Sequence, residues 1–424
     1  MKPQYRIKLF DFLNCLSDVL DWISPLLNDH HKQVALISLR IADALELSVI
    51  EQNEIVCAGI LHDIGAISLA ERMESMHFEY STGQAHAEMG YCLIKIFEPM
   101  RKVAELIRYH HVPWNNGHGQ TYKSYQVPLG SRILFMADHI ALQIKRNKEI
   151  LGQAESIKNK IIEASGTLIE PKLVNAFLEL ADKEYFWLDL VSPLISKQLE
   201  QTVRLETIYM NKKELLSFSG LIRRMIDFRN PFTATHSSGV SATAEYLGTL
   251  AGLNEHECFE LKVAGYMHDL GKLAIPAEIL EKPGKLDQDE FNLMRGHTFY
   301  TFRALESIED LNMINKYGSY HHERLDGTGY PFRLKKKDLP LGSRLLAVAD
   351  VFTALTEDRP YRKGMSNEQT IIILEKMGEN NKLDKEVIAL VKKNHEAINQ
   401  VRIEAQNNSR NEYRKFLSEI SDIP

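Results

Sequence analysis

Apolar residues recur with helical spacing in two well-separated segments of the chain. In residues 33–47 (QVALISLRIADALEL) and 239–253 (GVSATAEYLGTLAGL), apolar side chains stand at i, i+3, i+4 and i+7. This spacing places them on one face of an α-helix, whereas alternation of apolar and polar residues over the length of a strand is scarce. Pro25 and Pro231 each stand where a helix is expected to start. The pattern predicts an all-α protein.

The two halves of the chain repeat each other. The segments AGILHDIGAI (58–67) and AGYMHDLGKL (264–273) match at an offset of 206 residues, and other histidines recur in the same order. Such self-similarity indicates a tandem duplication. We predict domains at 1–205 and 206–424. The intervening segment 192–228 keeps a helical period, which predicts one long helix connecting the halves.

Composition excludes several classes of protein. The chain has 424 residues, 44% of them hydrophobic and 25% charged, as in an ordinary globular protein. The net charge of −6 offers no basic field for a nucleic-acid polymer. No apolar stretch approaches the roughly 20 residues of a membrane span, and the N-terminus shows no signal-peptide core. The four cysteines lie far apart and are expected to be buried thiols. We therefore expect a cytoplasmic protein without a membrane partner.

The recurring histidines and aspartates are suited to metal binding. His268 and Asp269 are adjacent, so on a helix their side chains would diverge by about 100°, and one could bind a metal ion while the other bridges to a second. His321 and His322 are expected to act in the same way from another helix. Imidazoles combined with carboxylates suit iron, manganese or zinc better than magnesium. Two ions held about 3.5–4 Å apart can bind a hydroxide and clamp a phosphoryl group.

The C-terminal half resembles a known family of enzymes. The motifs are HDLGK (268–272), HHERLDGTGYP (321–331) and VADVFTALTEDRPYR (348–362). They are similar to those of the HD-GYP phosphodiesterases, a branch of the HD superfamily of metal phosphohydrolases. The resemblance implies tandem HD-type helical bundles. It also implies hydrolysis of a 3′–5′ cyclic dinucleotide, cyclic di-GMP or 3′3′-cyclic GMP-AMP, to a linear dinucleotide by a metal-activated hydroxide.

The resemblance also implies roles for individual residues. Lys272 would contact the scissile phosphate beside Asp269, and Arg359 and Arg362 would bind phosphates of the nucleotide. Tyr330 and Gly329 would line the substrate pocket. The implied metal ligands are His236, His268, Asp269, His297, His321, His322 and Asp350.

One departure from the family bears on the number of metal ions. Some members carry a glutamate ligand one turn before the first histidine and bind three ions, but this chain has Phe232 there. We therefore expect two divalent transition-metal ions, iron or manganese, with zinc or nickel as alternatives.

The N-terminal half keeps the ligands but loses the other motifs. Ala66 replaces the lysine, HHVPWNNGHGQ (110–120) replaces the GYP loop, and no RPYR follows. The extra histidine His31 is expected to be exposed. This half is interpreted as a structural and dimerisation domain, a regulatory domain, or a second phosphohydrolase acting as a 5′-nucleotidase on the linear product. Its candidate ligands are His30, His62, Asp63, His86, His110, His111 and Asp138.

Two functions of the whole chain stay open at this point. The first is a cyclic-dinucleotide phosphodiesterase, which the complete ligand set and Lys272 favour. The second is a non-catalytic sensor of nucleotide or metal that acts through a partner. A homodimer and a signalling partner at the GYP loop, residues 321–331, also stay open.

Overall fold

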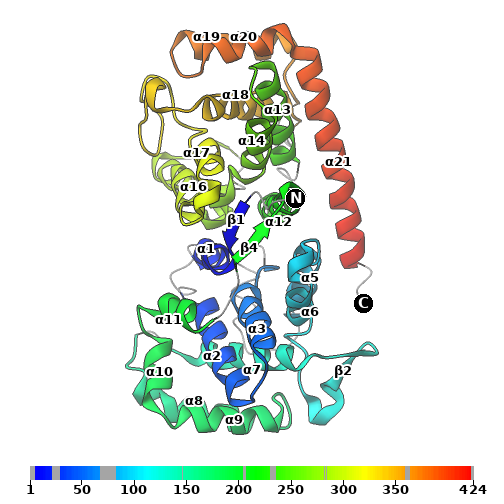
Figure 1. Ribbon diagram of the computed structural model, residues 1–424, viewed down its shortest axis with the longest axis vertical. Helices are drawn as coiled ribbons and strands as arrows, with labels where there is room; N and C mark the ends of the chain where they lie inside the picture. The colour runs from blue at the N-terminus through cyan, green and yellow to red at the C-terminus, as the bar shows by residue number, and fades with distance from the viewer. Residues whose placement is uncertain are drawn as a thin grey trace. The chain divides into compact units, whose positions relative to one another are not determined.

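The computed structural model describes residues 5–21, 29–66, 83–145, 147–203, 207–229, 235–280, 282, 284–358 and 363–421. Helices dominate these residues, and the strands are short (Figure 1), so the prediction of an all-α fold is confirmed. The chain divides into two compact units, Lys8–Ile208 and Tyr209–Pro424 with Met1–Ile7. The domain limits 1–205 and 206–424 stay a prediction.

The first unit is a bundle of helices with one short hairpin. The hairpin pairs β2 (Thr121–Tyr122) with β3 (Tyr125–Gln126) in antiparallel register. The helices are α1 (Leu9–Asp21), α2 (His30–Ala44), α3 (Val49–Leu61), α5 (Gly83–Ile94), α6 (Arg101–Arg108), α7 (Leu129–Gln143), α8 (Leu151–Glu163), α9 (Pro171–Ala181), α10 (Glu184–Leu190) and α11 (Ile195–Thr202).

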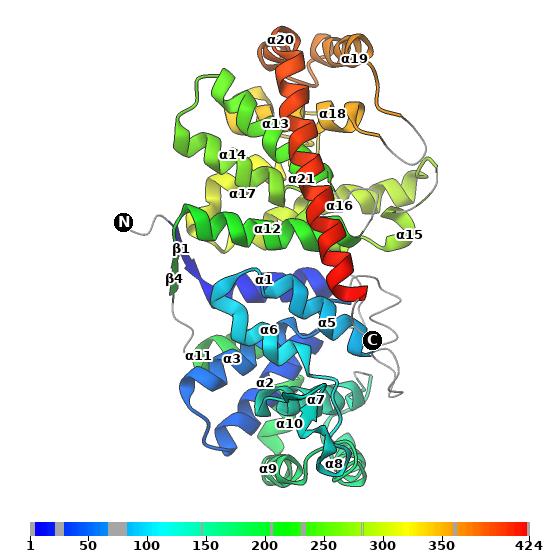
Figure 2. The same cartoon turned by 90° about the vertical axis from the view of Figure 1, so that its right-hand side faces the viewer.

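The second unit repeats the central helices and adds a long C-terminal one. Figure 2 shows this last helix, α21, running alongside α13, against which it packs. The helices are α12 (Lys212–Arg229), α13 (His236–Leu250), α14 (Glu255–Met267), α15 (Ala277–Leu280), α16 (Gln288–Glu306), α17 (Asn312–Ser319), α18 (Leu341–Thr356), α19 (Asn367–Glu379), α20 (Lys385–Lys393) and α21 (His395–Ser421).

The duplication is visible in packing and in helix capping. In the first unit α2 packs against α3 and α7, and in the second α13 packs against α14 and α18. The helices α3 and α14 both begin with a capping box, Ser48 with Glu51 and Asn254 with Glu257. Each box satisfies two backbone N–H groups that would otherwise lack partners. The same local chemistry therefore starts the same helix in both units.

A glycine in each unit lets two helices cross closely. A β-carbon on Gly59 would lie 2.8 Å from Cα of Ala35, and one on Gly265 would lie 2.4 Å from Cα of Ser241. Because both distances are too short for real contacts, a residue without a β-carbon is needed. The close crossing brings the ends of α3 and α14 against the helices that begin with His30 and His236.

The predicted long connecting helix is wrong. Helix α11 ends at Thr202, strand β4 occupies Thr207–Met210, and α12 starts at Lys212. Strand β4 pairs with β1 (Tyr5–Lys8), whose residues alternate between buried and exposed. Threonine, isoleucine and tyrosine favour strands, and the pairing partner lies some 200 residues away in the sequence, so helical periodicity alone misled the prediction.

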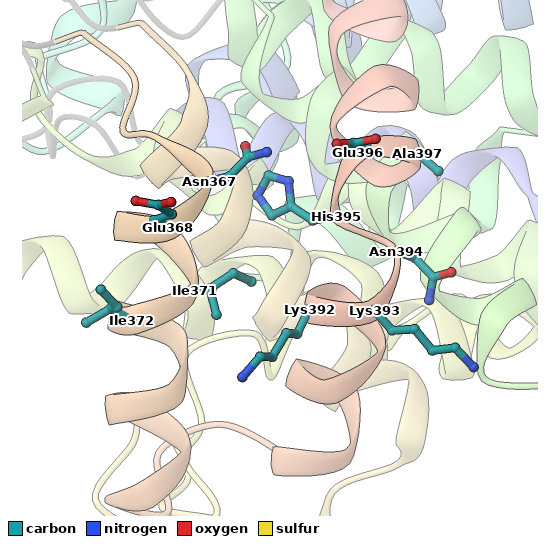
Figure 3. A pocket seen from close by; sticks show the side chains of 10 residues that line it. All are labelled: Asn367, Glu368, Ile371, Ile372, Lys392, Lys393, Asn394, His395, Glu396 and Ala397. Carbon is teal, nitrogen blue, oxygen red and sulfur yellow. The ribbon is translucent and has the colours of Figure 1, made fainter.

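One hollow in the second unit is separate from the predicted ligands. It has a volume of about 800 Å³ and lies among the starts of α19 and α21 and the end of α20 (Figure 3). Asn367, Lys392 and His395 are among its lining residues, and none of the predicted metal ligands is. The candidate site therefore lies elsewhere in this unit.

Two further features concern membrane-spanning helices and the cysteines. Among the described residues, no helix is both long and apolar enough to span a membrane. All four cysteines are buried thiols, as expected from their spacing.

Candidate metal centres

His268 and Asp269 stand at the C-terminal end of α14. His268 is the residue that ends the helix, and Asp269 already has a non-helical backbone with φ −100° and ψ 13°. His321 and His322 likewise follow the end of α17. The expectation that both pairs lie within helices is therefore corrected, because the divergence of the side chains comes from the turn that follows each helix.

Five buried histidines share one orientation. In each, ring Nδ1 lies 2.6–2.9 Å from the backbone carbonyl oxygen three residues earlier, to which it donates. This bond leaves Nε2 as the ring nitrogen that faces inward, where it can bind a metal ion once it carries no proton. The five are His62, His110, His268, His297 and His321.

The inward-facing nitrogens provide the test of whether metal ions fit. Nε2 of His62, His110 and His268 is buried, and among the described residues it has no hydrogen-bond partner. Oδ1 of Asp269 is also buried and likewise has no hydrogen-bond partner among the described residues. Buried polar atoms are normally satisfied, so a cluster of them calls for a ligand. Imidazole nitrogens beside a carboxylate are the donor set of a transition-metal ion, and the residues present therefore fit one.

Asp269 faces two groups of ligands at once. Its Oδ2 lies 3.2 Å from Nε2 of His268, and its Oδ1 lies 3.4 Å from Nε2 of His297. This is the arrangement expected of a carboxylate that bridges two ions. The donor atoms of His236, His268 and Asp350 lie within 4.8 Å of one another, and so do those of His297, His321 and His322. The structure thus brings together all seven residues predicted in this half.

The N-terminal unit reproduces this geometry with its own residues. Asp63 has Oδ2 at 3.3 Å from Nε2 of His62 and Oδ1 at 3.2 Å from Nε2 of His86. Nε2 of His30 lies 3.2 Å from Oδ1 of Asp138. The donor atoms form two clusters that share Asp63. One consists of His30, His62 and Asp63, and the other of Asp63, His86, His110 and His111.

Burial and neighbouring charges separate the histidines into two electrostatic types. Burial lowers the pKa of His297 to about 3 and that of His322 to about 4, so both rings are neutral and ready to bind metal at pH 7. Burial opposes protonation of His236 as well, but the carboxylates of Glu357 and Asp350 outweigh it and raise its pKa to about 10. These carboxylates therefore keep His236 protonated at pH 7, and a metal ion that binds its Nε2 would displace the proton.

The position three residues after Asp63 and after Asp269 distinguishes the two units. Nζ of Lys272 lies 2.6 Å from Oδ2 of Asp269, and this side chain is 28% exposed. At the equivalent place the N-terminal unit has Ala66, which is fully buried and carries no charge. A cation therefore stands at the edge of the C-terminal centre and is missing at the same place beside Asp63.

The GYP loop folds back beside the C-terminal centre. The ring centroid of Tyr330 lies 5.0 Å from that of His322. Buried Glu323 accepts hydrogen bonds from the backbone N–H groups of Phe332 and Leu334, which closes the loop. A β-carbon on Gly329 would lie 2.4–2.6 Å from the backbone of residues 323–324. The loop backbone therefore packs too closely at Gly329 for any side chain, and the role of Gly329 in lining a substrate pocket stays a prediction.

Three predicted features lie outside the described residues. Arg359 and Arg362 fall in 359–362, and Phe232 falls in 230–234. Their roles stay predictions.

His31 is buried, which corrects the expectation of an exposed side chain. It is 1% exposed, and its Nδ1 donates to Oδ1 of Asp21 at 2.5 Å. Ser237 occupies the matching position in the second unit, and its Oγ donates to Oδ1 of Asp227 at 2.7 Å. His31 therefore takes the place of Ser237 in a contact that both units use. Its helical position inside the bundle decides its burial, and the alignment of metal ligands could not show this.

Sequence reasoning missed one residue of the centre, Glu357. Its carboxylate oxygens lie 3.0 and 3.1 Å from Nδ1 of His236. The residue falls inside the quoted motif VADVFTALTEDRPYR, but the duplication gave no signal because the N-terminal unit has Lys145 at the matching position.

Paired histidine–aspartate centres at corresponding helix ends of a duplicated bundle define a class of metal-binding α-helical proteins. Comparison with family models agrees with this. Residues 220–387 match one model described as HD domain, and residues 28–142 match another with the same description. The chain carries two HD domains, one in each half.

Known proteins resemble the chain, one along nearly its whole length and another over about a third of it. It is 28% identical over 410 residues to the 3′3′-cGAMP-specific phosphodiesterase 1 of Vibrio cholerae, a match that covers 94% of this chain and 95% of the relative. It is 40% identical over 141 residues to the cyclic di-GMP phosphodiesterase PA4108 of Pseudomonas aeruginosa, covering 33% of this chain and 34% of that protein.

A solved structure shares the fold. The crystal structure of the cyclic GMP-AMP specific phosphodiesterase V-cGAP3 of V. cholerae matches with a TM-score of 0.63 at 22% identity. The match covers 91% of this chain and 97% of that one. At this identity the likeness shows the fold.

Proposed function

We propose that the C-terminal HD domain hydrolyses a 3′–5′ cyclic dinucleotide to a linear dinucleotide in a metal-dependent reaction. The observation that carries the proposal is the buried cluster of seven donor residues with Lys272 at its edge. A sensor without turnover would need no such lysine beside the bridging carboxylate. The names of the similar phosphodiesterases support the same reaction and substrate class.

The centre is proposed to hold two divalent transition-metal ions, iron or manganese, with zinc or nickel as alternatives. Its donors are imidazoles and carboxylates, which suit these metals. When bound, such a pair of ions supplies a nucleophilic hydroxide and charge for the phosphoryl group. Asp269 is oriented to bridge the two groups of ligands, and His268 and His297 each present a fixed nitrogen to one group.

The remaining residues bind and orient the substrate in this proposal. Lys272 places a positive charge where charge develops on the scissile phosphate, and such a contact typically contributes 10²–10³ in rate. Tyr330, beside His322, offers a ring on which a base can stack, and Gly329 shapes the loop that carries it. Arg359 and Arg362 are proposed to bind phosphates, since the guanidinium fork matches phosphate oxygens.

Two substrates fit the proposal, cyclic di-GMP and 3′3′-cyclic GMP-AMP. The relative that matches nearly the whole chain is named for the mixed molecule, which favours 3′3′-cyclic GMP-AMP. The test is to incubate the purified protein with Mn²⁺ or Fe²⁺ and each of cyclic di-GMP, cyclic di-AMP and 3′3′-cyclic GMP-AMP, and to identify products by mass spectrometry. Binding of a cyclic dinucleotide without any linear product would establish the sensor instead.

A second activity is proposed for the N-terminal HD domain, removal of the terminal phosphate of the linear product as a 5′-nucleotidase. The observation that favours it is the second complete cluster, with Asp63 placed between His62 and His86 as Asp269 is between His268 and His297. The absence of a lysine and of a GYP loop at this centre argues against ring opening there. A structural or regulatory role is the alternative, and release of inorganic phosphate from the linear dinucleotide separates them.

A further inference from the structure

We propose that Glu357 is a positioning residue of the C-terminal metal centre, and that Gln406 on the C-terminal helix α21 holds it in place. The inference rests on the proposed metal-dependent function. It concerns the orientation and basicity of His236, the candidate ligand whose donor atoms lie near those of His268 and Asp350.

Glu357 immediately follows α18, the helix that carries Asp350. Its Oε1 and Oε2 lie 3.0 and 3.1 Å from Nδ1 of His236, which donates to the carboxylate. Nε2 of His236 points the other way, 3.1 Å from Oδ1 of Asp350. The bond to Glu357 therefore orients Nε2 of His236 toward the donor atoms of Asp350 and His268.

His236 needs this support because of its place in the fold. The other oriented histidines of this unit, such as His268 and His297, donate to a backbone carbonyl one turn earlier. His236 is the first residue of α13, and its Nδ1 donates to the carboxylate of Glu357 instead. A carboxylate partner on a ligating histidine also raises its basicity, which a neutral carbonyl does less strongly.

Glu357 is itself held by α21. Nε2 of Gln406 donates to Oε2 of Glu357 at 3.1 Å, and Arg402 donates to Oε1 of Gln406. Both α21 side chains are 5% exposed. Because Arg402 occupies the amide oxygen of Gln406, the amide N–H₂ group faces Glu357. A chain of three hydrogen bonds thus leads from α21 to His236.

The N-terminal unit has a different residue at the position of Glu357. The offset that aligns Asp350 with Asp138 places Lys145 at the position of Glu357. A lysine has only donors and cannot accept a bond from a ring N–H. The inference therefore applies to one of the two centres and predicts a difference between them.

The experiment measures metal affinity directly. Full-length protein carrying His62→Ala and Asp63→Ala, so that the N-terminal centre does not contribute, is stripped of metal and titrated with Co²⁺ against a chelator. Glu357→Ala is expected to weaken Co²⁺ binding about 10–100-fold, the usual effect of losing such a partner. The visible Co²⁺ spectrum should change, because the ligand field at His236 changes. Gln406→Ala should shift both readouts in the same direction by less.

Two further variants make the result decisive. Glu412→Ala removes a carboxylate on α21 that pairs with Arg223 rather than with the centre, and it should leave affinity and spectrum unchanged. Glu357→Gln keeps the shape and one acceptor oxygen but removes the charge, so an intermediate loss is expected even if the alanine variant folds poorly. Unchanged Co²⁺ affinity and spectrum in Glu357→Gln and in a folded Glu357→Ala would overturn the inference. Absence of turnover with intact Co²⁺ binding would instead count against the proposed function.

Discussion

Nζ of Lys272 lies 2.6 Å from Oδ2 of Asp269, the carboxylate placed between the two groups of candidate ligands. Burial opposes ionisation of Asp269, but His268 and then Lys272 outweigh it and hold its pKa well below the usual range. The carboxylate is therefore charged at any physiological pH and available for metal. The lysine is held by this contact at the edge of the centre, where a phosphate oxygen would approach.

Replacing Lys272 should slow catalysis and leave the metal in place. We expect Lys272→Ala to lower kcat about 10²–10³-fold, because a positive charge aimed at the scissile phosphate acts mainly in the transition state. Metal content, measured by elemental analysis, should stay near that of the unaltered protein. Lys262→Ala is a matched control, since Lys262 is 29% exposed and pairs with Glu245 away from the centre. Full activity of Lys272→Ala would remove this residue from the mechanism.

Paired substitutions should distinguish the activities of the two centres. His268→Ala with Asp269→Ala should abolish ring opening, because it removes a fixed ligand and the bridging carboxylate together. His62→Ala with Asp63→Ala should leave ring opening intact but stop release of terminal phosphate. Both products are followed by mass spectrometry. If ring opening is lost with the first-unit pair and kept with the second-unit pair, the two activities are assigned to the wrong halves.

Metal binding should release protons at neutral pH. Burial disfavours the protonated rings of His236 and His62, but nearby carboxylates raise their pKa to about 10 and about 9. Each ring therefore carries a proton at pH 7 that a metal ion must displace, giving about one proton released per centre. His297 and His322 are already neutral and release none.

Calorimetric titration of metal-free protein in two buffers of different ionisation enthalpy measures this release. As the pH rises through 9 and then 10, the protons are lost before the metal arrives, so release should fall toward zero while apparent affinity rises. Metal binding at pH 7 without proton release would contradict the expected charge state of His236 and His62.

The helix crossing beneath the C-terminal centre should not tolerate a side chain. In Gly265→Ala the new β-carbon would lie 2.4 Å from Cα of Ser241, so the helices must separate, at a cost of about 1–3 kcal/mol. We expect a lower thermal unfolding temperature and weaker metal binding, because Gly265 also supplies the carbonyl that orients His268. Gly220→Ala is the control. Apart from the backbone of its own helix and its chain neighbours, no described atom lies within 4 Å of a β-carbon there. Alanine also favours the α12 helix, so the unfolding temperature should stay or rise. Equal effects of the two substitutions would show that the close crossing does not matter.

Histidine spacing carried most of the information on the candidate site. His236, His268 and Asp350 are far apart in the sequence, yet their recurrence in both halves identified them as one set, and the structure brings their donor atoms within 4.8 Å. Periodic apolar residues likewise predicted the helices α2 and α13. These features follow from local rules that repeat at fixed intervals, so a single sequence reveals them.

Other features depended on partners that no local pattern names. Strand β4 exists because β1 pairs with it, and the sequence between the halves alone favours a helix. His31 faces the inside of the bundle, where Asp21 on the preceding helix accepts its N–H. Glu357 meets His236 because α18 and α13 pack side by side, and Gln406 donates to Glu357 from α21. The sequence by itself determined the helical class, the duplication and the metal-binding residue types. The tertiary structure decided which nitrogen of each ring faces inward and which carboxylate supports it, because hydrogen-bond geometry arises only when separate helices pack together.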